Sequence, residues 1–271
     1  MAKNNSSLTE TKEEKLFYAR LDDLARYADN GSVAESDFMS PSEQYKAEKY
    51  FLVKGSKGRI CCFGGYFAAQ RKQVLLLPEY LTEHIGYSSA EEMIADGYSS
   101  ISALRIEGSG YRTLSHRDYL GALLSLGIKR SMLGDICVFG DCEAVVFCRR
   151  EIEDFILSTL SEVGSDKVRV SKTKIDVNMP SCERFESLCD TVASNRIDCV
   201  VASLCNLSRE KAQTLVVGGL VEHNYSQDTA PDSRVSQGDV ISARGYGKFI
   251  VRDIGDRTKR GRIRLLADKY V

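Results

Sequence analysis

The sequence predicts an α+β protein. A helical N-terminal region precedes an RRM-like, ferredoxin-like middle domain, and a small α+β domain forms the C-terminal end. Three observations support this prediction: apolar residues at helical spacing in residues 12–53, a strand-helix-strand-strand-helix-strand order in residues 101–174, and two short helices followed by two strands in residues 196–243. The predicted domains are residues 8–57, 58–178 and 188–271.

Composition is typical of a globular protein with hydrophobic cores. The chain has 271 residues, of which 43% are hydrophobic and 28% are charged. No apolar run approaches a membrane span, and the polar residues 1–11 lack a signal-peptide core, so we expect a cytoplasmic protein without membrane contact. The nine cysteines form no Cys-x-x-Cys pair, which predicts reduced thiols, no disulfide framework and no metal site.

Charge is unevenly distributed along the chain. The net charge is −1, yet residues 196–271 carry thirteen Lys or Arg against nine Asp or Glu. This end is therefore at +4, and the remainder of the chain is at −5. The asymmetry predicts an anion-binding C-terminal end.

Two helices are predicted in the N-terminal region. Residues 12–27 carry an apolar stripe among charged residues. A second helix should begin at Pro41, with Ser40 as its N-cap, and end before Gly55. A strand at residues 74–78 then belongs to the predicted middle domain.

The middle domain alternates strands and helices. We expect strands at 101–107, 136–139, 144–148 and 167–174, and helices at 115–126 and 151–160. Ser115 and Asp118 form a capping box for the first helix, and Gly127 ends it. A hairpin turn is expected at Gly140-Asp141.

The C-terminal domain opens with two short amphipathic helices. Asn195 is the expected N-cap of the first, with Asp198 three residues later. Ser208 is the expected N-cap of the second, and Gly218-Gly219 ends it. A hairpin-like pair of strands follows at residues 219–224 and 238–243.

The order of these motifs resembles the ribosomal-protein-S4-type RNA-binding domain. The matching elements are Arg196-Ile197-Asp198, Leu207-Ser208-Arg209, Gly219-Leu220-Val221-Glu222-His223-Asn224 and Gly238-Asp239-Val240-Ile241. The chain departs from the pattern at His223, where Val is common, and at Tyr225-Ser226, where Lys or Gly often follows the Asn. The resemblance implies RNA binding by this domain.

The residues themselves also favour an RNA surface. Arg196, Arg209 and Lys211 surround two helix starts, whose N–H groups and dipoles attract phosphate. Arg244-Gly245-Tyr246-Gly247-Lys248-Phe249 mixes cations with aromatic residues that could stack on bases or pack in a core. Residues 259–265 alternate basic and apolar residues, as an edge strand with one cationic face would.

Further motifs extend the resemblance to nearly the whole chain. Phe38-Met39-Ser40-Pro41, Phe63-Gly64-Gly65-Tyr66, the run of residues 114–130 and Gly134-Asp135-Ile136 look like the YlmH family of bacteria. This resemblance implies a ribosome-associated protein in translation quality control on stalled large subunits carrying peptidyl-tRNA. It also implies an association with cell division and protein partners in either process.

Signals for catalysis are incomplete. His116-Arg117-Asp118 copies the kinase catalytic triplet, but Leu123 stands where the Asn is needed. His84-Ile85-Gly86-Tyr87 lacks the last His of the class I aminoacyl-tRNA synthetase signature, and the chain has only three His. The Arg-Leu-Asp motif that carries the catalytic Asp of pseudouridine synthases has no separate counterpart here. We therefore expect no catalysis, no cofactor and no metal.

The leading hypothesis is a non-catalytic RNA-binding protein acting on rRNA and tRNA at the ribosome. Two alternatives stay open: an RNA-modifying enzyme with a cryptic site in the middle domain, and a middle domain that serves as a protein-interaction platform. The residues expected to contact RNA lie in the C-terminal and middle domains: Arg196, Ser208, Arg209, Lys211, Gln213, Asn224, Arg244 and Lys248, and Arg117, Lys129 and Arg130.

Overall fold

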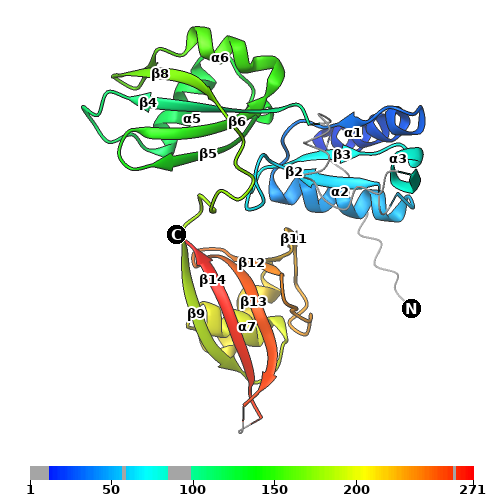
Figure 1. The fold of residues 1–271 in the computed structure, drawn as a ribbon. Coiled ribbons are helices and arrows are strands. Elements are labelled where there is room, and N and C mark those ends of the chain that lie inside the picture. The colour runs from blue at the N-terminus through cyan, green and yellow to red at the C-terminus, as the bar shows by residue number, and fades with distance from the viewer. Residues whose placement is uncertain (1–11, 57–58, 85–98, 259–260) are drawn as a thin grey trace. The chain divides into compact units, whose positions relative to one another are not determined.

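The chain folds into two compact units, Met1–Cys182 and Glu183–Val271 (Figure 1). The fold is taken from a computed structural model, which describes residues 12–56, 59–84, 99–258 and 261–271. Helices and antiparallel sheets occur in both units, so the predicted α+β class is confirmed. No helix within these described ranges is long and apolar enough to cross a bilayer.

The first unit begins with a module of helices packed on a small sheet, which we call the helical module. Its helices are α1 (Lys12–Asp29), α2 (Pro41–Val53) and α3 (Glu79–His84). Its antiparallel sheet has the order β1-β3-β2, formed by Ala34–Glu35, Gln73–Leu76 and Ile60–Phe63. Ser40 caps α2 in a capping box with Glu43, as the sequence indicated for this N-cap.

Strands β2 and β3 pack in the helical module, whereas the predicted middle domain of residues 58–178 includes them. Strand β3 pairs with β1 and with β2. Val74 and Leu76 of β3 pack against Leu21 of α1 and Phe51 of α2 in one core. Sequence patterns could not reveal this pairing, because β1 has only two residues and no periodicity of its own.

A second module of the first unit, the middle module, forms a five-stranded sheet with two helices. Its strands have the order β5-β6-β4-β8-β7 and are all antiparallel. Their bounds are Ile101–Gly108 for β4, Leu133–Phe139 for β5, Glu143–Arg149 for β6, Glu162–Val163 for β7 and Asp166–Thr173 for β8. Helix α5 (His116–Ser125) joins β4 to β5, and α6 (Glu153–Thr159) joins β6 to β8, which confirms the ferredoxin-like order.

The local signals for α5 also hold. Ser115 and Asp118 form both hydrogen bonds of the capping box, and Gly127 takes a φ of 82° after the helix. The carboxylate of Asp118 is therefore a cap, so the resemblance of His116-Arg117-Asp118 to a kinase triplet has a structural explanation. His84 begins the other enzyme-like tetrapeptide, whose remaining residues lie outside the described ranges.

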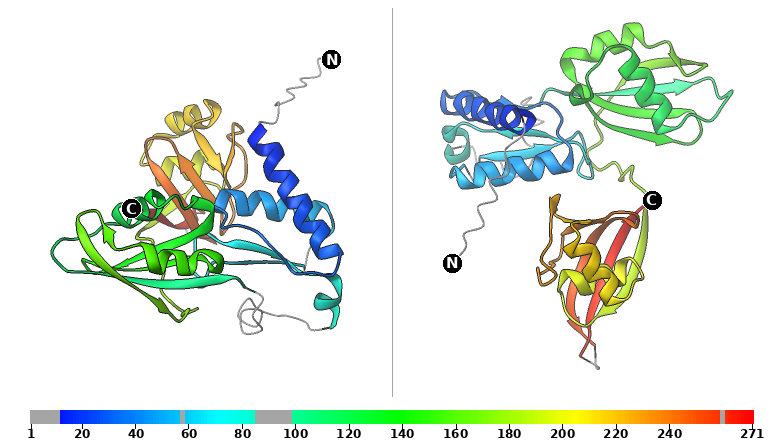
Figure 2. Two further views of the ribbon diagram at one scale, coloured as in Figure 1. Left: turned by 90° about the horizontal axis from the view of Figure 1, so that it is seen from above. Right: turned by 180° about the vertical axis from the view of Figure 1, so that it is seen from behind.

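The second unit is a six-stranded antiparallel sheet with both helices on one face (Figure 2). Its strand order is β11-β10-β12-β13-β14-β9. The strands are Phe185–Val192 (β9), Val221–His223 (β10), Ser226–Gln227 (β11), Val240–Ala243 (β12), Gly247–Arg257 (β13) and Ile263–Tyr270 (β14). The helices are α7 (Ile197–Leu204) and α8 (Arg209–Val217), and Gly219 takes a φ of 67° after α8, as expected.

Two predictions for this unit are wrong. Asn195 does not cap α7. Arg196 occupies the N-cap position without a side-chain cap, and the side-chain amide of Asn195 donates to the carbonyl of Val235. The basic strand near residue 263 is not an edge, because β14 lies between β13 and β9. The edge strand on this side of the sheet is β9. Its sequence is too polar to be recognised as a strand from apolar alternation.

The cysteines depart from the expectation of free thiols throughout. Cys137 of β5 and Cys182 form a disulfide across 45 residues of sequence. The other seven are free, and burial raises the pKa of Cys62 and of Cys148 to about 12. No spacing rule could pair Cys137 with Cys182, because the contact depends on how the chain returns to the sheet after β8.

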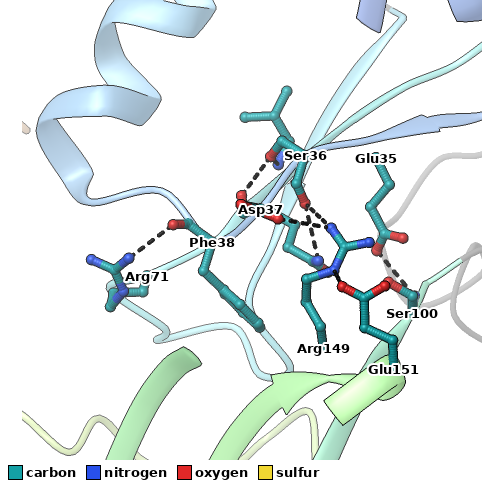
Figure 3. Close-up of polar contacts among 10 residues, drawn as sticks. Glu35, Ser36, Asp37, Phe38, Arg71, Ser100, Arg149 and Glu151 are labelled. Carbon is teal, nitrogen blue, oxygen red and sulfur yellow. Dashed lines mark hydrogen bonds and ion pairs between the residues drawn. The ribbon is translucent and has the colours of Figure 1, made fainter. Parts of the chain in front are cut away.

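Polar contacts join the helical module to the middle module (Figure 3). The guanidinium of Arg149 donates to the Ser36 carbonyl at 3.1 Å and to Asp37 Oδ1 at 3.2 Å. The Ser100 amide donates to Glu35 Oε1 at 3.0 Å. The two modules therefore share hydrogen bonds as well as a core.

Asp135 supplies a further link between these modules. Its carboxylate accepts from Tyr66 Oη at 2.8 Å and from the amides of Gln70 at 2.7 Å and Arg71 at 3.0 Å. We expect Asp135→Ala to lower the free energy of unfolding by about 2–3 kcal/mol, because hydrogen bonds to a carboxylate are lost and their donors stay partly buried. Urea unfolding followed by circular dichroism measures the loss. Asp141→Ala, at an exposed position, is the control, and an equal effect of both changes would contradict this role.

Candidate nucleic-acid interface

The cations of the C-terminal unit gather where α7 and α8 begin. Arg196 immediately precedes α7, and Arg209 is the first residue of α8. Their side chains are 38% and 60% exposed. Sequence placed both at helix starts, and the structure brings the two guanidinium groups to one carboxylate.

That carboxylate is Asp198, which is 1% exposed. It accepts two hydrogen bonds from Arg196 at 3.1 Å, one to each oxygen, and Oδ2 accepts from Arg209 at 3.3 Å. The Cys199 amide donates to Oδ1 at 2.9 Å. Asp198 was expected to pair with Asn195 as the N-cap of the helix; instead it holds two arginines whose side chains stay partly exposed.

The charge states follow from this geometry. Burial raises the pKa of Asp198, but the hydrogen bonds from Arg196, Cys199 and Arg209 outweigh it, so the pKa lies below its ordinary value. The hydrogen bond to Asp198 raises the pKa of Arg196. The carboxylate and both guanidinium groups are therefore charged, and the cluster keeps one net positive charge.

The two helix starts differ as anion sites. A loop blocks the start of α7: the amide of Ile197 donates to the Ser233 carbonyl at 2.8 Å, and that of Asp198 to the Pro231 carbonyl at 3.3 Å. The α7 amides are thus unavailable to phosphate, contrary to our expectation. At α8, the hydroxyl of Ser208 accepts from the Lys211 amide at 3.4 Å, so its predicted cap is confirmed.

Helix α8 presents a polar outer face. Lys211 and Gln213 are exposed, while Ala212 and Val216 of the same helix are fully buried in the core of the unit. Because the buried residues fix the rotation of the helix, Lys211 is exposed in the first turn of α8, the turn that Arg209 begins. We call the three cations at these two helix starts, Arg196, Arg209 and Lys211, the helix-start surface.

Asn224 occupies a tight turn between β10 and β11. Asn224 and Tyr225 take φ values of 48° and 62°, as a two-residue hairpin turn requires. The Asn224 amide donates to Asp239 Oδ1 at 2.8 Å, and its oxygen accepts from the Val240 amide at 2.9 Å. Both polar atoms of this proposed RNA contact are thus used inside the protein.

His223 adds to the same network. Its Nδ1 lies 3.3 Å from Asp228 Oδ2, and its Nε2 lies 2.7 Å from Asp239 Oδ2. These contacts tie β10 to both ends of the segment between β11 and β12. No sequence pattern indicates this role, since His223 is notable in the sequence only as a departure from the common Val.

The two other basic residues that were predicted to contact RNA in this unit differ in exposure. Arg244 is exposed beyond β12. Lys248 is half-buried, with its ammonium 5.1 Å from the ring centre of Tyr225 and 4.6 Å from that of Tyr270, and burial lowers its pKa. Among the two aromatic residues considered for stacking, Phe249 is a core residue, 1% exposed, whereas Tyr246 is 37% exposed.

The three basic residues of the middle module that were predicted to contact RNA differ in exposure. Arg117 is exposed in the first turn of α5, and Lys129 is exposed after its end. Arg130 is half-buried, and its guanidinium donates to the carbonyls of Leu133 at 2.7 Å and Gly134 at 3.0 Å. Burial lowers its pKa to about 10. Arg130 therefore supports the backbone at the start of β5.

Comparisons with known proteins show which proteins this chain is similar to. Residues 100–177 match the family described as "Putative RNA-binding domain in YlmH". The "Ribosome-associated protein quality control protein P2" of Bacillus subtilis (strain 168) is 32% identical over 237 residues, which cover 86% of each chain. A solved structure, "Cell division protein ylmH from Streptococcus pneumoniae", is 18% identical, covers 62% of this chain and 97% of that chain, and has a TM-score of 0.46.

We expect Asp198→Asn to lower the free energy of unfolding by about 1.5–3 kcal/mol at neutral pH, because charged hydrogen bonds are lost. A lowered native pKa means that the carboxylate stabilises the fold above the pKa of the unfolded chain, about 3.9, and loses this effect as pH falls below about 4. The difference between parent and variant should therefore shrink in acid. Urea titrations at several pH values measure it.

Asp232→Asn is the matched control for this prediction. Asp232 is exposed and lies near the same Arg196, without sharing the hydrogen bonds of Asp198. Its replacement should leave the free energy of unfolding unchanged. A constant Asp198→Asn effect down to pH 3 would mean that the carboxylate charge is not what stabilises this site.

Proposed function

This chain belongs to the YlmH family, and from that premise we propose that it is a non-catalytic protein that binds structured RNA on the ribosome. The helix-start surface is the observation that carries this proposal. Asp198 holds Arg196 and Arg209 in fixed positions, and Lys211 is exposed in the first turn of α8. Fixed cations of this kind suit phosphate contacts, which position a protein on RNA.

The ribosome is proposed as the place of action because of the relative. The Bacillus subtilis protein carries ribosome-associated quality control in its name, and the alignment spans most of both chains. We extend this role to the present chain and place it in the cytoplasm. The proposed partners are rRNA and tRNA on large subunits, together with protein partners in translation quality control or cell division.

The C-terminal unit is proposed to be the S4-type RNA-binding domain. The motifs that carry this resemblance have separate tasks in the structure. Arg196 and Arg209 form the helix-start surface, whereas Asn224 and Asp239 hold a turn together. Arg244 and Lys248 extend the candidate contacts onto the sheet, and Ser208 and Gln213 belong to α8 and its cap.

An RNA-modifying activity of the middle module has less support. His116 is exposed, and the neighbouring carboxylate of Asp118 accepts from the amide and hydroxyl of Ser115. A general base needs a carboxylate or imidazole free to take a proton from substrate. A binding protein therefore explains these residues with fewer assumptions than an enzyme does.

RNA affinity should fall steeply with ionic strength. Each phosphate neutralised by Arg196, Arg209, Lys211 or other cations of this unit should add about 0.7–0.9 to the slope of log affinity against log salt. Fluorescence anisotropy with labelled rRNA fragments at several salt concentrations measures this slope. An affinity that hardly changes between low and physiological salt would refute the phosphate contacts.

Replacing Arg209 and Lys211 together with Ala should weaken ribosome binding strongly. The double variant should lose about 1–2 kcal/mol of stability and still fold, because Arg209 no longer donates to the buried Asp198, whereas Arg196 and the Cys199 amide still do and the buried Ala212 and Val216 are untouched. Co-sedimentation with ribosomes and thermal melting are the two measurements.

The control for this variant is a double replacement of Lys12 and Lys15 with Ala on α1. It removes the same charge from exposed positions of the other unit. It should co-sediment like the parent. Equal co-sedimentation of both double variants would show that the helix-start surface is not the ribosome contact.

A further inference from the structure

The sheet of the middle module has one face that its own helices do not cover. Leu104, Ile106 and Val146 face α5 and α6 in one core. Ala103, Val145 and Phe147 alternate with them and point to the opposite face. In RRM domains the helix-free face of the sheet carries the aromatic residues that stack on bases. What covers this face therefore decides whether the module can bind RNA in that way.

An aromatic ring of the helical module lies on this face. Phe147, on the central part of the sheet, is only 1% exposed, and the ring of Tyr66 stacks on it with 5.1 Å between centroids and an angle of 23°. Gly65 has a φ of 103°, and a Cβ at this position would lie 2.2 Å from the Phe147 ring. Only glycine lets the backbone approach so closely, so Gly65 and Tyr66 occupy the place of a stacked base.

The covering segment is held at several points. Asp135 accepts from Tyr66 and from two amides of the following turn. The Phe67 amide donates to the carbonyl of Val177 at 3.0 Å. After β8 the chain returns over the same face, where Val177 and Met179 join its core and Cys182 is bonded to Cys137. The cover is therefore built into the fold of the first unit.

The other half of this face carries cations that are already paired. Arg105 donates to Glu143 Oε1 at 2.7 Å on the neighbouring strand. Arg169 lies 3.1 Å from Glu107 Oε2. The register of β4 with β6 and β8 places all four residues on the face of Phe147. Each cation is thus offset by a carboxylate, which removes the net charge that would attract phosphate.

We propose that the helix-free face of the middle module is a docking surface for the chain's own residues 64–71, and not a platform for RNA. The module uses an RRM-like sheet to bind protein, and RNA contacts lie outside this face. The docking surface itself does not depend on the proposed function. Only the statement that RNA is bound elsewhere on the chain rests on it. It also explains why two motifs far apart in sequence are in contact: Tyr66 of Phe63-Gly64-Gly65-Tyr66 donates to Asp135 of Gly134-Asp135-Ile136.

Photo-crosslinking of the full chain tests the location. The probe is oligouridylate carrying 4-thiouridine, and crosslinked peptides are identified by mass spectrometry. We expect crosslinks from the C-terminal unit and none from Tyr66, Arg105 or Phe147. A crosslink to any of these three would overturn the proposal. If no peptide of the chain crosslinks to this probe or to a structured rRNA fragment carrying 4-thiouridine, the proposed RNA-binding function is refuted, while the docking surface is judged by the variants that follow.

Two variants test the docking directly. Tyr66→Phe keeps the ring on Phe147, whereas Tyr66→Ala removes it. We expect faster hydrogen exchange in β6 for Tyr66→Ala than for Tyr66→Phe, with an oligouridylate Kd within roughly two-fold of the parent for both. Binding tightened about five-fold or more by Tyr66→Ala would overturn the proposal, because a base-stacking platform would have been uncovered. If Tyr66→Ala does not fold, the ring is required for the fold, and the parent's crosslinks decide the RNA question.

Discussion

A buried carboxylate that accepts hydrogen bonds from two arginines organises the C-terminal unit. Asp198 is 1% exposed, so its charge would be costly without partners, and Arg196 and Arg209 supply them from the first turns of two helices. The same bonds that stabilise the carboxylate restrict the guanidinium groups. A fixed cation loses less conformational entropy on meeting phosphate than a free side chain does. The stability of this unit and the geometry of its proposed RNA surface thus depend on one interaction.

The first unit uses a carboxylate in a comparable way, but to join modules. Asp135 at the start of the middle sheet gathers Tyr66 and the amides of the following turn, and Arg71 of that turn donates to the carbonyls of Phe38 and Leu133. Burial lowers the pKa of Arg71. The guanidinium of Arg71 therefore uses its donors on backbone carbonyls inside the protein. Basic residues in this unit cannot be counted as RNA contacts from their charge alone.

Local signals were sufficient for the elements that local chemistry specifies. Ser40, Ser115 and Ser208 were predicted as N-caps and are N-caps, because a cap needs only the next three residues. The predicted N-cap at Asn195 is wrong because a loop more than thirty residues later provides acceptors for the backbone amides at the start of α7. The pairing of β3 with β1 and the Cys137–Cys182 bond were missed for the same reason. Each depends on a distant segment that no local pattern contains.

The candidate site divides along the same line. The RNA-contacting residues were predicted from residue type and position in the sequence. Those that are exposed in the structure, such as Arg209 and Lys211, remain suited to contact phosphate. Arg130 has the same charge, yet its donors are spent on Leu133 and Gly134. Phe147 likewise has the residue type of a stacking platform, but a tyrosine already lies on it. What a surface can bind therefore depends on which groups the fold leaves exposed, and a ferredoxin-like sheet can serve protein docking as well as nucleic-acid recognition.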